Sequence, residues 1–271
     1  MTNVKTATCS LFNDYTFVDK IINTKINRRG RKLTEQTSVD GAVVGRVAFT
    51  YDEQGRVTRT LLNDRIAVTA TYNLQGWLTG IAADNASETI FSEVLRYYNA
   101  TDSKSSPYYS GKISELNWQR NASDNNSDRF VYHYNLQGYL SSTEHRITGS
   151  NQNTDGSYSE DFTYDLAGNI LVHNANKGGA NQQLCYTYTG NHITSVAQDG
   201  NSVGTAQYDS RGNITKIPGE NLQIAYNLCN LPQSITASDG TKVNYGYLSD
   251  GTKFSAVSDG GEKFIYAGSL K

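Results

Sequence analysis

The four histidines, His133, His145, His173 and His192, offer the widest choice of catalytic chemistry in this chain. Acid-base catalysis places a histidine beside an acid and a nucleophile, and signatures such as HExxH or GxSxG reveal some of these arrangements. Neither signature surrounds any of the four. We therefore expect structural histidines, no catalytic residues and no enzyme. A hydrolase whose site forms only in three dimensions stays open as a remote alternative, because such sites are recognised by geometry.

Metal ligands are the second kind of chemistry to consider. Asp124, Asn126 and Asp128 fill the first, third and fifth places of a possible calcium loop. Arg129 stands where that loop needs a glycine, and Asn135 stands where it needs a glutamate. We expect a solvated loop here, with no metal and no cofactor.

The three cysteines, Cys9, Cys185 and Cys229, are far apart and odd in number. They form neither a CxxC pair nor a Cys/His spacing, so no disulfide framework or zinc site is predicted. Cys185 alternates with Leu184 and Tyr186, which is typical of a thiol packed in a strand.

A basic run follows residue 24, and its members are Lys25, Arg28, Arg29, Arg31 and Lys32. Such a run can contact phosphate or act as a targeting patch. It also reads as a turn, INRRGRKLTE, and we favour that interpretation. The formal net charge is −2, so nothing draws the whole chain to nucleic acid.

Composition predicts an all-β protein. The chain has 271 residues, of which 37% are hydrophobic and 11% aromatic, with 19 tyrosines. Its 24 glycines and three prolines are typical of many tight turns between strands. No apolar run is long enough for a transmembrane helix, and the N-terminus lacks the features of a secretory signal. We expect a soluble chain without membrane insertion, whose parent protein is secreted or on the cell surface.

The strongest signal is an internal repeat, Tyr-[Asp/Asn]-x-x-Gly-x-apolar-[Thr/Ser]. Five copies are present, of which the fourth differs only at the last position: YDEQGRVT, YNLQGWLT, YNLQGYLS, YDLAGNIL and YDSRGNIT. Two weaker copies begin at Tyr226 and Tyr247, and two shortened copies begin at Tyr109 and Tyr188. The residues that define the repeat are Tyr51, Gly55, Tyr72, Gly76, Tyr109, Gly111, Tyr134, Gly138, Tyr164, Gly168, Tyr188, Gly190, Tyr208, Gly212, Tyr226, Tyr247 and Gly251.

Each motif encodes a strand, a turn and a return strand. Aromatic residues two positions before the tyrosine, such as Phe49 before Tyr51, indicate one face of a strand. Asp or Asn then bonds the backbone two residues on, and Gly supplies positive φ. Between motifs lie Asp-Gly pairs such as Asp40-Gly41 and Asp155-Gly156, which are strong hairpin signals. We predict tandem hairpins in an open or spiralling antiparallel β-sheet strip.

This pattern resembles the YD or Rhs repeats of bacterial polymorphic toxins, of the B and C components of Tc toxins and of teneurins. The resemblance covers residues 26–271, which we expect to form one continuous β domain. Residues 1–25 suit either a helix or strands, and we expect a strand-rich entry segment. The resemblance implies a hollow shell around a cargo, commonly a C-terminal toxin domain, but no Asp-Pro junction of the kind at which some members cut themselves is present.

Size limits what one chain can enclose. Nine repeats imply about 18 strands, or about 86 Å of sheet at about 4.8 Å per strand, and a lumen of roughly 17 Å if closed. A 100-residue domain is over about 30 Å across. We therefore expect a segment of a larger scaffold, whose partners are further YD-repeat segments or a second copy joined through sheet edges, with a toxin cargo as a further possibility. A carbohydrate-binding or adhesion module is the alternative, since exposed tyrosines can bind sugar rings.

Overall fold

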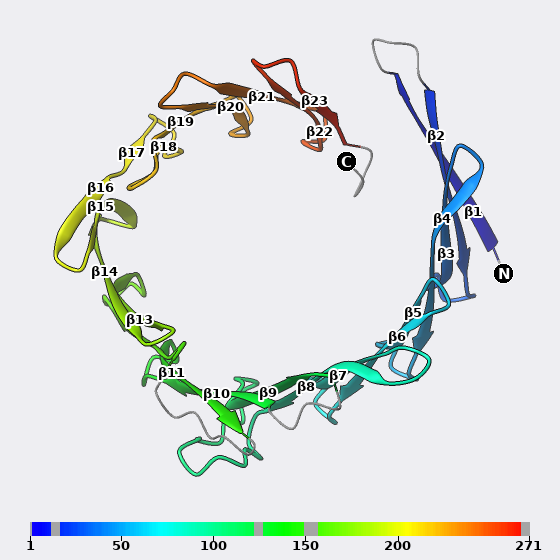
Figure 1. The fold of residues 1–271 in the computed structure, drawn as a ribbon, viewed down its shortest axis with the longest axis horizontal. Helices are drawn as coiled ribbons and strands as arrows, with labels where there is room; N and C mark the ends of the chain where they lie inside the picture. The colour runs from blue at the N-terminus through cyan, green and yellow to red at the C-terminus, as the bar shows by residue number, and fades with distance from the viewer. Residues whose placement is uncertain (1, 12–16, 122–126, 149–156, 267–271) are drawn as a thin grey trace. The chain divides into compact units, whose positions relative to one another are not determined.

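The protein consists of β-strands joined by turns, as the computed structural model shows for residues 2–11, 17–121, 127–148 and 157–266 (Figure 1). The all-β prediction is confirmed. Residues 2–11 and 17–26, for which a helix was the alternative, are strands. The strands are β1 (Thr2–Leu11), β2 (Phe17–Ile26), β3 (Lys32–Val39), β4 (Ala42–Tyr51), β5 (Val57–Leu62), β6 (Ile66–Tyr72), β7 (Leu78–Asp84), β8 (Thr89–Arg96), β9 (Glu115–Arg120), β10 (Ser127–Tyr134), β11 (Leu140–Thr148), β12 (Glu160–Tyr164), β13 (Ile170–Lys177), β14 (Ala180–Thr189), β15 (His192–Gln198), β16 (Asn201–Thr205), β17 (Gln207–Tyr208), β18 (Ile214–Lys216), β19 (Leu222–Tyr226), β20 (Pro232–Ala237), β21 (Lys242–Tyr247), β22 (Lys253–Ser258) and β23 (Lys263–Ile265).

The strands hydrogen-bond in chain order, giving an open sheet of 16 strands, β1 to β16, and an open sheet of seven, β17 to β23. Contacts divide the chain into two compact units. Unit 1 comprises residues 1–160 and 176–180, and unit 2 comprises residues 161–175 and 181–271. Sequential antiparallel strands need only short turns, which the glycine-rich motifs provide.

Few apolar side chains are buried, because the strands form two single-layered sheets and contact mainly their sequential neighbours. Among the described residues these are Leu95, Tyr97 and Val131 in unit 1 and Ala175 and Ala256 in unit 2. Most other strand residues are only partly covered. Stability must therefore come chiefly from cross-strand pairs and from contacts between successive hairpins.

A β-bulge precedes the tyrosine in most of the motifs. The register shifts between Thr50 and Tyr51 and between His133 and Tyr134, and the same shift recurs before Tyr72, Tyr188, Tyr208, Tyr226 and Tyr247. A bulge locally increases strand twist and redirects a side chain. Its recurrence turns each of these tyrosines toward the preceding hairpin.

The described part of the chain contains no helix long and apolar enough to cross a membrane.

Candidate functional site

The second residue of the motif builds the turn. Asp52 Oδ1 accepts the Arg56 amide at 2.8 Å, and Asn73 Oδ1 accepts the Trp77 amide at 2.9 Å. The backbone closes the same turn, since the Gly55 amide donates to the Asp52 carbonyl. Gly55 has a φ of 91°, a value that disfavours other residues. The turn therefore uses the polar groups of Asp or Asn for local structure.

Hydrogen bonds within the turn hold the pKa of two motif aspartates, Asp165 and Asp209, below the ordinary value for an aspartate. For Asp165 the largest cause is the Asn169 side-chain amide, followed by the Asn169 backbone amide. Asp209 is lowered in the same way by Asn213. These carboxylates stay ionised as turn acceptors.

The tyrosine hydroxyl links each hairpin to the one before it. Tyr51 Oη donates to the Lys32 carbonyl at 2.7 Å, and Tyr188 Oη donates to the Ile170 carbonyl at 2.8 Å. In both cases the acceptor is the first residue of the preceding return strand, and in the other links it lies at or within two residues of the start of that strand. The same bond, between 2.7 and 3.1 Å, is made by Tyr72, Tyr97, Tyr134, Tyr208, Tyr226 and Tyr247.

In several motifs the residue after the glycine covers the next tyrosine ring. The Arg56 guanidinium lies 4.7 Å from the Tyr72 ring centre, and Lys112 Nζ lies 5.1 Å from that of Tyr134. Both contacts have cation-π geometry. Lys112 also packs over Gly138, where a Cβ atom would collide with its side chain. The motif glycine thus leaves room for its neighbour as well as supplying the turn.

Tyr97, rather than Tyr109, takes the tyrosine place in the third motif, the one whose glycine is Gly111. Tyr97 is 6% exposed and donates its hydroxyl to the Leu78 carbonyl at 2.7 Å, whereas Tyr109 is 75% exposed. Gly111 keeps the glycine place, with a φ of 86° and Trp77 packed beside it. Residues 98–110, which we call the insert, therefore lie between the two halves of one motif.

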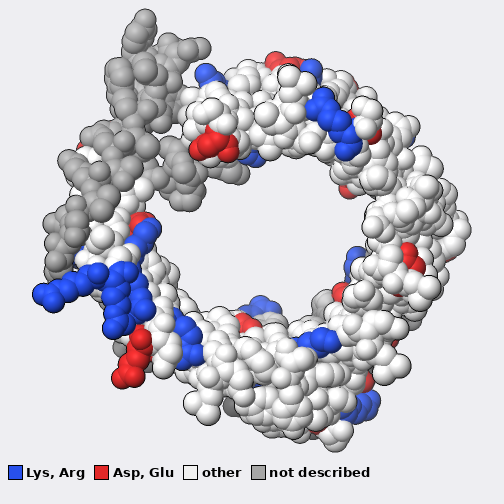
Figure 2. Space-filling view, turned by 180° about the vertical axis from the view of Figure 1, so that it is seen from behind, with Lys and Arg blue, Asp and Glu red and all other residues white. Residues whose placement is uncertain are grey.

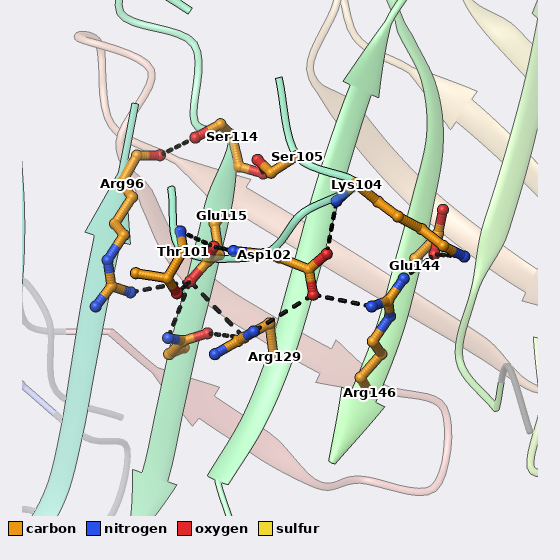
Figure 3. A network of polar contacts seen from close by, with 11 residues as sticks. Arg96, Thr101, Asp102, Lys104, Ser105, Ser114, Glu115, Arg129, Glu144 and Arg146 are labelled. Atoms are coloured by element: carbon orange, nitrogen blue, oxygen red, sulfur yellow. Dashed lines mark hydrogen bonds and ion pairs between the residues drawn. The ribbon is translucent and has the colours of Figure 1, made fainter. Parts of the chain in front are cut away.

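The insert is fixed to unit 1 by a buried carboxylate, Glu115, whose side chain is fully covered (Figure 3). Glu115 Oε2 accepts the amides of Thr101 at 2.8 Å and Asp102 at 2.9 Å. Its Oε1 accepts the Thr101 hydroxyl at 2.9 Å and Arg96 Nη1 at 3.0 Å. A buried charge is tolerated when it is paired and hydrogen-bonded in this way.

Asp102, on the insert, is the second carboxylate of this network. Its Oδ2 lies 2.9 Å from Arg146 Nη1 and 3.3 Å from Arg129 Nη1, with the side chain 5% exposed. Arg146 also pairs with Glu144 at 2.6 Å. Figure 3 shows these groups reaching one another from β8, β9, β10, β11 and the insert. Their roles are structural, because every one of these carboxylates is paired with a cation.

The histidines lie in different surroundings. His145 is 6% exposed, its Nε2 is 2.7 Å from Asp128 Oδ1, and its ring lies against Phe130. His133 Nε2 lies 3.5 Å from a Glu144 oxygen. The other two also lie against aromatic rings: His173 stacks on Phe162, and the His192 ring is tilted against Tyr208.

The possible calcium loop falls mostly outside the described residues, which contain Asp128 but neither Asp124 nor Asn126. Across the described ranges, no three His, Cys, Asp or Glu side chains are grouped so as to hold a metal ion. Cys185 is half-buried and Cys229 is exposed, and both are free thiols.

The basic run adopts the motif turn. Gly30 has a φ of 75°, its amide donates to the Asn27 carbonyl, and Asn27 Oδ1 accepts the Arg31 amide at 3.1 Å. A cavity of about 520 Å³ lies between this turn and the next one, with lining residues that include Arg28, Arg29, Arg31, Phe49 and Tyr51. The Arg31 guanidinium lies 5.6 Å from the Tyr51 ring centre.

Comparison with known proteins finds similar structures only. No protein-family model matches the chain, and no curated protein matches it in sequence. A chain in the crystal structure of TcdB2-TccC3-TEV matches with a TM-score of 0.50 and 14% identity, over 94% of this chain. A chain in the crystal structure of TcdB2-TccC3 matches with a TM-score of 0.49 and 12% identity, over 88%.

These matched structures belong to a Tc toxin assembly that contains Rhs repeats. This chain spans 15% of the length of the first and 16% of the second. At such identity the first match shows a shared fold. An antiparallel sheet of tandem hairpins is therefore the class to which the structure belongs.

Proposed function

We propose that this chain is a non-catalytic scaffold segment, part of a β-shell of the kind that encloses a C-terminal toxin in secreted bacterial polymorphic toxins. The observation that carries this proposal is the tyrosine link between hairpins. Motif residues that could have formed a binding site instead bond the preceding hairpin or their own turn. The fold shared with a Tc toxin chain supports the same role.

A scaffold segment of this kind joins further repeats through its end strands. β23 pairs with β22 on one side, and no described strand pairs with its other side. The Tyr266 amide donates to the Phe254 carbonyl, so in antiparallel alternation the Lys263 and Ile265 amides face away from β22. Unpaired amides at a sheet edge are a template for another strand.

The test replaces one outward amide without disturbing the pairing with β22. Ile265→Pro removes that amide, and proline is tolerated on the free side of an edge strand. Ile265→Ala is the matched control. We expect wild-type and control chains to bind a longer YD-repeat protein, measured by sedimentation, and Ile265→Pro to lose binding. Equal binding by all three, or no binding by the wild type, would contradict the proposal.

Carbohydrate binding is the second candidate, and the observation that favours it is the exposed ring pair of Tyr98 and Tyr109. The two rings are 5.3 Å apart and nearly parallel, with an interplanar angle of 5°. An exposed ring face of this type suits a sugar ring. A glycan array with wild-type and Tyr109→Ala chains tests it, because this change leaves every tyrosine link in place. Absence of sugar binding by the wild type would remove this candidate.

A further inference from the structure

One turn of unit 1 is cationic, and one turn border of unit 2 has an exposed carboxylate at every turn. Because successive strands are antiparallel and hydrogen-bond in chain order, the motif turns of each unit lie on one border and the remaining turns lie on the other. We call these the motif-turn border and the hairpin border. They are distinct from the end strands, since they present side chains and not unpaired backbone.

Unit 1 has a cationic turn on its motif-turn border. Arg28 and Arg29 are exposed, and Arg31 is half-exposed. Within the described ranges, no carboxylate forms an ion pair with any of these three guanidiniums. They line the 520 Å³ cavity described above. Figure 2 shows blue side chains gathered on one part of the surface, on which neutral residues otherwise predominate.

Unit 2 has an anionic hairpin border. Its four turns on this side comprise residues 199–200, 217–221, 238–241 and 259–262. Each turn has at least one exposed carboxylate and contains no lysine or arginine, although Lys216, Lys242 and Lys263 lie in the strands directly beside three of the turns. The exposed acids are Asp199, Glu220, Asp239, Asp259 and Glu262.

The two borders also match in spacing. A turn recurs on either border after every second strand, and strands lie about 4.8 Å apart, so turns on both recur about every 10 Å. One border of a strip can therefore meet the opposite border of another strip turn against turn. The motif-turn border also exposes an apolar tip, Leu74, which is fully solvent-accessible. Covering it would add apolar burial to the charge attraction.

We propose that a second copy of this chain docks here, with the hairpin border of its unit 2 placed against Arg28, Arg29 and Arg31 of the first copy. The contact joins two different surfaces, so it is heterologous and can continue from copy to copy. This proposal does not depend on the scaffold function, because it concerns the turn borders and a copy of the same chain.

The test uses charge reversal on both surfaces of the full chain, with association measured by sedimentation velocity. The variants are Arg28→Glu/Arg29→Glu and Asp239→Lys/Asp259→Lys, with Arg59→Glu, an exposed strand residue, as the control. We expect at least about tenfold weaker self-association for either double variant and no change for the control. Raising the salt from about 0.01 M to about 1 M should weaken wild-type association, because screening shortens the range of the attraction.

Mixing the two double variants is the decisive step. The mixture offers two complementary contacts, one between the Glu-substituted turn and the Lys-substituted border and one between the two unaltered surfaces. Association between the two variants should therefore return to within about threefold of the wild type. Failure of the mixture to associate would overturn the proposal, as would a wild type that stays monomeric at low salt. The Ile265→Pro chain should self-associate like the wild type here, which separates this contact from pairing through the end strand.

Discussion

Replacing Glu115 with glutamine should release the insert from the sheet. The change removes the negative charge of the carboxylate. That carboxylate pairs with Arg96 and accepts hydrogen bonds from the backbone amides of Thr101 and Asp102. Breaking a buried ion pair on one side costs about 3–5 kcal/mol. Because Arg96 is 22% exposed and is left partly solvated, we expect the lower end, about 3 kcal/mol.

Hydrogen exchange measures this cost directly, since the amides of Thr101 and Asp102 report their own opening. A loss of about 3 kcal/mol corresponds to about 150-fold faster exchange at these amides. Glu53→Gln is the control, because Glu53 is exposed on a motif turn. Amides in β5 should be unchanged in both variants, since effects in a repeat sheet stay close to the altered hairpin. Less than about threefold faster exchange at Thr101 would refute the structural role of Glu115.

Lowering the pH should also release the insert, because protonation removes the charge of Glu115. Burial alone raises the pKa of Glu115, but the amides of Asp102 and Thr101 and the charge of Arg129 bring it below the ordinary value of 4.5. A lowered pKa in the folded state gives stability that is present above the unfolded pKa and is lost as the pH falls through the folded one. The insert should therefore open only as the pH falls below the ordinary value of 4.5 and through the lowered pKa of Glu115. Near-ultraviolet circular dichroism of wild-type and Glu115→Gln chains would show whether that acid transition depends on Glu115.

Three further predictions concern the motif. Tyr188→Phe should lower the free energy of unfolding of its hairpin by about 1 kcal/mol, seen by urea denaturation, because the Ile170 carbonyl loses its donor, whereas Tyr109→Phe should have no effect. Gly138→Ala should lower the free energy of unfolding by at least about 1 kcal/mol, since φ is 87° at Gly138 and the Lys112 side chain occupies the place of the added Cβ atom. Gly45→Ala should leave the free energy of unfolding nearly unchanged. Burial raises the pKa of Tyr134 to about 12. Tyr134→Phe should therefore remove the step at highest pH when tyrosine ionisation is followed by ultraviolet absorbance. Loss of a step at lower pH instead would contradict this.

The fold was predictable because the repeat specifies local structure in each copy. Tyr51, Asp52 and Gly55 determine a strand end, an acceptor for the turn and a positive φ, and the structure places all three in those roles. None of this needs information from distant residues. The bulge before the tyrosine was not predicted, because it arises from pairing with the return strand.

The third motif was assigned the wrong tyrosine because the insert separates its tyrosine from its glycine. The short copy at Tyr109 satisfied the spacing rule, while Tyr97 lay 14 residues before Gly111. One signal was available in the sequence. Leu95 and Tyr97 alternate as other motif tyrosines do with the residue two positions earlier, and the structure buries both of them.

The sequence contains no comparable pattern that predicts the network around Glu115. Its members are distant in sequence and meet only because β8, β9, β10 and the insert converge on one face (Figure 3). A single glutamate in an alternating strand normally indicates a solvent-facing position. Its burial depends on an insert that covers it, and a repeat pattern cannot reveal what an irregular segment covers.

The variable position after the motif glycine also follows from the geometry. Arg56, Trp77 and Lys112 differ in charge and shape, yet each lies on the tyrosine ring of the next motif. The contact requires only a long or flat side chain beside an open ring face, which cations and aromatic rings both provide. The glycine before it is more restricted, since a side chain there would meet its neighbour. The variable residue and the constant glycine before it thus have the same cause, which is the stacking of one hairpin on another.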